Sequence, residues 1–100
     1  MQHIGVRRES ETGQPIADFD PDGIDLRIVT EAPDTSVCLR FIDPYGNLII
    51  NQLQLPVLIA ELQEISHGTL DFGLKKHIAT LVQFLRDSEG VHVYVRFIGD

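Results

Sequence analysis

The sequence has little cysteine and no long apolar run, and each shortage excludes a class of protein. Its single cysteine, Cys38, has no partner for an internal disulfide, which argues against a small secreted scaffold. The longest apolar stretch is interrupted at Asn51, Gln52 and Gln54, so it falls short of a bilayer crossing. The first eight residues lack the charged start and apolar core of a signal peptide. We therefore expect a cytoplasmic protein.

Basic residues are also scarce, and the imbalance is concentrated in the first third. The chain has 8 Lys and Arg against 15 Asp and Glu, which gives a net charge of −7. Between residues 9 and 34, Arg27 is the single base, whereas acids and bases balance in the rest. The acids of this segment are Glu9, Glu11, Asp18, Asp20, Asp22, Asp25, Glu31 and Asp34. This charge repels nucleic acid and anionic membrane, and it favours a basic partner.

Length and composition predict a single domain over residues 1–100. At 100 residues the chain is close to the commonest domain size. Hydrophobic residues make up 43% and charged residues 23%, which is typical of globular proteins. A chain of this size and composition can bury a core without disulfide or metal support.

Period-two patterns and turn residues predict several short strands. Thr12-Gly13 separates two extended segments, and Asp-Pro-x-Gly turns occur at 20–23 and 43–46. The expected strands lie at about 3–8, 14–19, 24–29, 37–42, 48–50 and 91–98. In the segment 37–42 the alternation places Val37, Leu39 and Phe41 toward the core. The segments 37–42 and 48–50 flank a Pro/Gly turn and are expected to form a hairpin.

Between residues 55 and 85 the apolar period becomes helical. The first apolar stripe is Leu55, Leu58, Ile59, Leu62 and Ile65, and the second is Leu74, Ile78, Leu81, Val82 and Leu85. Pro56 suits a first helical turn, Gly68 a C-terminal cap and Asp71 an N-cap. The sequence thus predicts an α+β fold, with an antiparallel sheet of about five or six strands and two helices on one face. The last strand is expected to be central.

Two residue patterns suggest metal or nucleophile chemistry, and neither is complete. Asp18-x-Asp20-x-Asp22-Gly23 matches the first half of an EF-hand calcium loop, but its twelfth position is Val29 rather than glutamate. An acidic turn is the simpler interpretation. Cys38 and four histidines do not match a zinc arrangement or a catalytic pair, and a buried Cys38 is expected. We predict no catalytic residues, no metal site and no cofactor, since phosphate-loop and dinucleotide motifs are also missing.

Two surfaces are candidates for protein contact. One is the acidic segment, where Glu9, Glu11, Asp18, Asp20, Asp22 and Asp25 would steer a basic partner. The other is the outer face of the sheet, expected to carry Cys38, Arg40 and Ile42 together with His92, Tyr94, Arg96 and Ile98. Aromatic and arginine side chains are common interface anchors, and Tyr45 and Tyr94 are the anchors we expect.

The segment from Leu39 to Leu62, with its Phe-Ile-Asp-Pro-Tyr-Gly motif and Leu-Pro helix start, resembles a group of small uncharacterised bacterial proteins. The ending Val-His-Val-Tyr-Val-Arg-Phe-Ile-Gly-Asp shares this resemblance, which covers about a third of the chain. It implies a bacterial cytoplasmic protein and attaches no activity or site residue.

The sequence therefore favours a non-enzymatic protein-interaction domain that binds a basic protein, in the manner of an immunity protein or inhibitor. Charge reversal at Asp20 and Asp22 should then slow association at low salt. Two alternatives stay open. One is a small homo-oligomeric enzyme or ligand-binding protein, for which a homodimer would build the site. The other is a structural subunit of a larger assembly.

Overall fold

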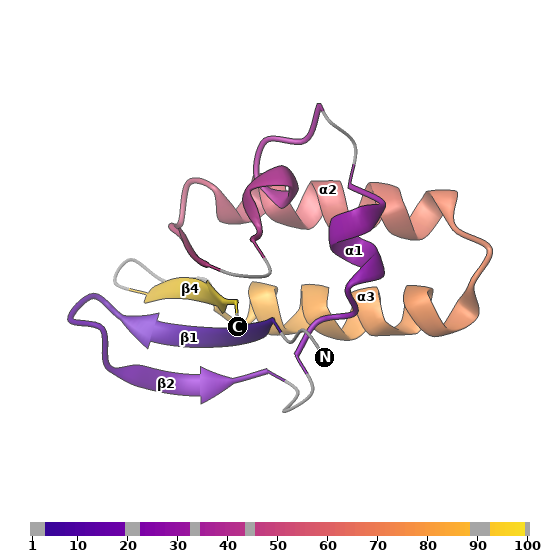
Figure 1. Cartoon of the computed structure of the whole chain (residues 1–100). Coiled ribbons are helices and arrows are strands. Elements are labelled where there is room, and N and C mark those ends of the chain that lie inside the picture. The colour runs from indigo at the N-terminus through magenta and orange to yellow at the C-terminus, as the bar shows by residue number, and fades with distance from the viewer. Residues whose placement is uncertain (1–3, 20–22, 33–34, 44–45, 89–92, 100) are drawn as a thin grey trace.

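The sheet combines strands from both ends of the chain (Figure 1). The computed structural model describes residues 4–19, 23–32, 35–43, 46–88 and 93–99. In these residues four antiparallel strands lie in the order β2-β1-β4-β3. Their bounds are β1 Gly5–Ser10, β2 Pro15–Asp18, β3 Asn47–Ile50 and β4 Val93–Ile98. The α+β class, the antiparallel sheet and the central position of the last strand are confirmed. The expected five or six strands are wrong for this part of the chain.

The first hairpin forms as predicted, around Thr12-Gly13. The Ser10 N–H donates to the Gln14 carbonyl at 2.9 Å, and the Gly13 N–H donates to the Ser10 carbonyl at 3.0 Å. Gly13 has φ of 84°, a left-handed conformation that residues with a Cβ rarely adopt. The glycine therefore lets β2 return alongside β1.

Both long helices are confirmed. Helix α2 spans Leu55–Gly68 with Pro56 in its first turn, and helix α3 spans Phe72–Arg86. The Asp71 carboxylate accepts the Leu74 N–H at 3.0 Å, which is the predicted N-cap. Gly68 is the last residue of α2 rather than its cap, because Thr69 leaves the helix in an extended conformation. The two predicted apolar stripes are buried over their full length.

The strand expected over residues 24–29 is wrong. The chain forms a short helix there, α1 (Arg27–Thr30), and the Arg27 N–H donates to the Asp25 carboxylate at 3.0 Å at its start. Ile24 and Ile28 are buried at 4% and 0% exposed. Their spacing of four residues suits a helical turn, which a six-residue alternating pattern does not distinguish from a strand.

The strand expected over residues 37–42, and its hairpin with 48–50, are also wrong. Residues Leu39–Phe41 form a 3₁₀ turn, η1, and β3 pairs with β4 instead. Cys38, Leu39 and Ile42 are buried, whereas Val37 and Phe41 are 63% and 55% exposed. This turn-like spacing of buried residues reverses the predicted orientation at several positions. Cys38 and Ile42 therefore do not belong to the outer face of the sheet.

Helices α2 and α3 cover one face of the sheet, which leaves the molecule with two layers (Figure 1). Val6 and Ile50 are paired with Phe97 and Val95 of β4, and all four side chains are buried on the helical side. The alternate residues of the same strands point to the other side, as the period of two requires. We call this second side the outer sheet face. It carries Arg7, Glu9, Ile16, Asp18, Ile49, Tyr94, Arg96 and Ile98.

Arg8 is a charged residue on the helical side, and the end of α3 accounts for it. Its Nε donates to the Ser88 hydroxyl at 2.8 Å, and a terminal guanidinium nitrogen donates to the Phe84 carbonyl at 3.2 Å. The guanidinium also lies 4.7 Å from the centre of the Phe84 ring. A cation at a helix C-terminus satisfies carbonyl groups that lack partners within the helix. Arg8 thus ties β1 to α3.

Candidate functional site

Three acids of the predicted steering set are paired with arginines inside the chain. Glu9 accepts from Arg96, Asp18 accepts from Arg7 at 3.0 Å, and the Asp25 carboxylate accepts from Arg27 at 2.7 Å. Pairing leaves the net charge of the protein unchanged, but it removes the local negative potential at these points. Nearby arginines therefore partly neutralise the acidic surface that the sequence predicts.

Glu9 is the most deeply placed of these acids. Although it points to the outer sheet face, it is 6% exposed. Its two carboxylate oxygens lie 3.0 and 3.1 Å from the Arg96 Nε of the neighbouring strand. In the strand register Glu9 is opposite Tyr94, and Arg96 is opposite Arg7, so the ion pair is diagonal. Glu9 therefore offers little accessible surface to a partner, and its carboxylate instead holds the Arg96 side chain in place.

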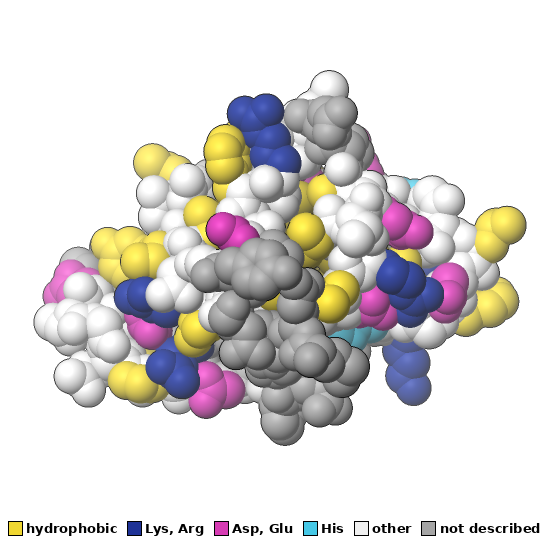
Figure 2. All heavy atoms as spheres, viewed as in Figure 1, with side chains coloured by type: hydrophobic (Ala, Val, Ile, Leu, Met, Phe, Trp, Pro, Cys, Tyr) yellow, Lys and Arg dark blue, Asp and Glu magenta, His cyan; other side chains and the backbone are white. Residues whose placement is uncertain are grey.

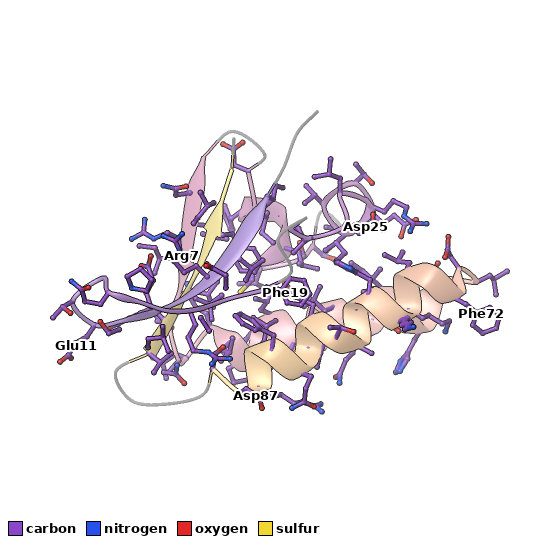
Figure 3. All side chains as sticks on the ribbon, turned by 90° about the horizontal axis from the view of Figure 1, so that it is seen from below. Arg7, Glu11, Phe19, Asp25, Phe72 and Asp87 are labelled. Carbon is purple, nitrogen blue, oxygen red and sulfur yellow. The ribbon has the colours of Figure 1, made fainter. Side chains whose placement is uncertain are left out.

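The remaining predicted contact residues are scattered. Glu11 lies in the exposed hairpin turn at one end of the molecule, as Figure 3 shows. Tyr94 is half-buried on the outer sheet face, where it lines a shallow depression of about 200 Å³ with Glu9, Ile49 and Arg96. Asp20, Asp22 and Tyr45 lie outside the described residues. The structure thus brings Glu9, Glu11 and Tyr94 to one depression and leaves Asp25 at α1.

Arg27 links helix α1 to the start of helix α3. It donates to the carboxylates of Asp25 and Asp71. The hydrogen bond from the Arg27 side chain holds the pKa of Asp25 below its usual range, and burial acts in the opposite direction. The Leu74 N–H and then Arg27 lower the pKa of Asp71 in the same way. Both carboxylates raise the pKa of the Arg27 guanidinium. This junction is stabilised only while both acids are ionised.

The ion pairs of Arg27 predict how the stability of the fold depends on pH. Carboxylates with a lowered pKa stabilise the folded state above the unfolded pKa of about 3.9, and the stabilisation is lost as pH falls through the folded pKa. We expect the urea midpoint of the wild type to exceed that of Arg27→Gln at pH 6 by a small margin, because the pairs are exposed. The two midpoints should converge below about pH 3. A constant difference between pH 6 and pH 2.5, measured by circular dichroism, would contradict this assignment.

The turn between α2 and α3 exposes two large apolar side chains that were not among the predicted contact residues. Leu70 is 96% exposed and Phe72 is 84% exposed, on either side of the Asp71 N-cap. Figure 3 shows Phe72 pointing into solvent at the end of α3, at the opposite end of the molecule from Glu11. Figure 2 shows apolar atoms at this extremity, with acidic and basic side chains beside them. Neither residue belongs to the apolar stripe of α2 or α3. Their exposure could therefore have been predicted from the sequence.

A groove of about 690 Å³ opens next to these side chains. It is lined by Glu31, Glu64, Ile65, Gly68, Thr69, Leu70 and Asp71. Of its three acids, Asp71 is paired with Arg27, whereas Glu31 and Glu64 belong to no ion pair within the described residues. We call Leu70, Phe72 and this groove the turn surface. It combines apolar side chains with negative charge.

Glu61 serves the fold at a second groove, between α2 and the segment before η1. Its carboxylate accepts the backbone N–H groups of Val37, Cys38 and Leu39, the last two at 3.0 Å. The buried Cys38 side chain lies beside it, and burial, with a smaller effect of Glu61, raises the pKa of the thiol. A protonated thiol is a poor nucleophile. The expected burial of Cys38 is confirmed, although its expected strand is not.

The acidic motif at 18–23 is described only at its two ends. Asp18 is paired with Arg7, and Gly23 has φ of 75°. Within the described ranges no three acidic, histidine or cysteine side chains gather closely enough to hold a metal ion. Nor does any helix there have the length and apolar character needed to cross a membrane.

Comparison with known proteins gave no match to a family model, a curated protein or a solved structure.

Proposed function

We propose that this chain is a non-enzymatic protein-interaction domain whose turn surface binds a basic protein partner. The observation that carries the proposal is the near-complete exposure of Leu70 and Phe72 beside a groove that contains Glu31 and Glu64. Isolated exposed apolar side chains are common on protein surfaces, whereas neighbouring ones that form a patch rimmed by polar or charged groups mark interaction sites.

The charge of the molecule supports a basic partner rather than an acidic or neutral one. The chain carries a net charge of −7, and Glu31 and Glu64, which form no ion pair with any residue that the structure describes, lie at the groove itself. Such charge speeds the encounter with a basic protein, whereas buried apolar anchors slow dissociation. Lys75 and Lys76 follow on α3 and do not line the groove. We therefore expect the acids to set the association rate and Leu70 and Phe72 the lifetime.

A comparison of immobilised baits in native lysate of the source organism tests this. The wild type should retain a basic protein that elutes as salt rises, since screening weakens exposed charge pairs. Leu70→Ser with Phe72→Ser should raise its dissociation rate at least about tenfold. Glu31→Lys with Glu64→Lys should instead slow association, and mainly at low salt.

Leu53→Ser is the matched control, because Leu53 is 86% exposed and lies before α2, outside the groove. It should leave retention unchanged. Equal retention by all baits, or a partner lost equally from the control, would contradict the assignment of the turn surface. Recovery of only acidic proteins would contradict the basic character of the partner.

A further inference from the structure

The outer sheet face differs from the turn surface in both chemistry and charge. On the described strands it carries two arginines, Arg7 and Arg96, and two carboxylates, Glu9 and Asp18. The chain as a whole has a net charge of −7, so this face is a locally balanced region on an acidic molecule. The hairpin turn adds Glu11 at its margin.

The uncharged side chains of this face are those that interfaces favour. Ile16 on β2 is 52% exposed, and Ile49 on β3 is 48% exposed. Tyr94 and Ile98 of β4 are half-buried between them. Aromatic residues and arginine are enriched at protein interfaces, whereas lysine is depleted, and both lysines of the chain lie on α3. Apolar residues therefore flank a charged centre on a face that the helices leave uncovered.

A partner can cover the charged centre of this face without leaving a buried charge unpaired. Glu9 is already buried and is held by the Arg96 Nε through both oxygens, and Asp18 is held by Arg7. Burying an ion is costly when it loses water without gaining a partner. Here each carboxylate has its partner before any contact is made, so covering the face removes water mostly from paired groups.

We propose that the outer sheet face binds a second copy of this chain, which forms a two-fold symmetric dimer with the sheets face to face. A two-fold contact places the same patch on both sides, so it must be self-complementary. Two positive and two negative groups satisfy this requirement, because an arginine of one copy can lie opposite a carboxylate of the other. A basic partner would gain little from a face with no net charge, which makes the second copy the better fit.

The area of the outer sheet face determines the affinity that we expect for the dimer. Four strands at about 4.8 Å spacing and six residues at about 3.4 Å give roughly 20 by 20 Å. This area, about 400 Å², is roughly half of the 800 Å² that each partner of a standard interface buries, so the contact belongs with weak, transient interfaces. We therefore expect a reversible dimer that forms in the micromolar range.

Salt should strengthen this dimer. Two copies with a net charge of −7 each repel one another, and added salt screens that repulsion while the balanced contact changes little. Binding of a basic partner at the turn surface should respond in the opposite direction. The two proposals can thus fail independently.

Sedimentation equilibrium of the full chain over about 1–500 µM protein, at about 0.05 and 0.5 M salt, tests the dimer. The dissociation constant should fall several-fold at the higher salt. Ile49→Glu and, separately, Ile16→Glu should raise it at least about tenfold, because each places uncompensated negative charge in the contact. Both side chains are half-exposed, and circular dichroism verifies that the variants fold.

Leu53→Glu is the matched control, since it adds the same charge at a position that is 86% exposed and lies between β3 and α2, outside both proposed surfaces. It should leave the dissociation constant within about twofold of the wild type. A monomer at every concentration and salt would overturn the proposal. So would a dimer that weakens with salt, or one that survives both isoleucine substitutions.

Discussion

Replacing Glu61 with alanine is expected to lower the free energy of unfolding by about 3 kcal/mol. The Glu61 carboxylate accepts three backbone N–H groups in succession, from Val37, Cys38 and Leu39, and it does so from a half-buried position on α2. Removing it leaves these donors without their charged acceptor. At roughly 4–8 °C per kcal/mol for a domain of this size, the thermal midpoint should fall by about 15 °C.

Two further variants separate the charge from the shape of the side chain. Glu61→Gln keeps one acceptor oxygen but directs an NH₂ group toward backbone donors, so we expect most of the loss to remain. Glu64→Ala is the matched control one turn along α2, where the side chain is exposed, and it should change stability by less than about 0.5 kcal/mol. Similar losses for Glu61→Ala and Glu64→Ala would show that Glu61 has no special part in holding η1.

Replacing Arg96 with methionine is expected to cost about 2 kcal/mol, because Glu9 then loses its cation while 6% exposed. A fully buried pair would cost more, but the Arg96 side chain is 29% exposed and water can partly replace it. Urea denaturation at pH 7 measures the effect.

A double-mutant cycle tests whether the loss comes from the pair. The double variant Glu9→Gln, Arg96→Met removes both charges, so it should be less destabilised than the sum of the two single variants, with a coupling of about 1–2 kcal/mol. Arg7→Met with Asp18→Asn offers a comparison pair on the same face. Its side chains are 36% and 67% exposed, so the coupling there should be below about 0.5 kcal/mol. Equal coupling in both pairs would contradict the view that burial makes the Glu9–Arg96 pair distinctive.

The two long helices were predictable because their stripes extend over several turns. Helices α2 and α3 are 14 and 15 residues long, and each presents five buried residues at helical spacing. The Asp71 cap added an independent signal at the same boundary. A helix can be predicted from sequence when several local signals agree on its position.

The strand errors have a common physical origin in side chains distant in the sequence. Residues 37–39 alternate like a strand, yet the Glu61 carboxylate on α2 takes their N–H groups and favours a turn. Residues 24–29 likewise lose their strand to a helical turn that places Ile24 and Ile28 in the core. A pattern of six consecutive residues shows neither the distant Glu61 acceptor nor the place of Ile24 and Ile28 in the core.

The candidate surfaces could be predicted only in part. Composition locates the acids but not their partners, and the ion pairs of Glu9, Asp18 and Asp25 join strands or helices whose arrangement was not available from the sequence. The exposure of Leu70 and Phe72 could have been inferred, since neither fits a stripe. The balanced charge of the outer sheet face depends on the pairing of β1 with β4, which the sequence does not specify.

That pairing has a consequence for how the molecule comes to be folded. Strand β1 pairs with β4 along all six residues of each strand, and β4 is the one described strand with which β3 pairs. During synthesis the hairpin of β1 and β2 therefore has no neighbour to complete the sheet until residue 98 has left the ribosome. Closing so long a loop is entropically costly, which favours slow folding. A chain that stops before Val93 would expose the apolar sides of β1, β3 and both long helices at once, and would be a substrate for proteases and chaperones.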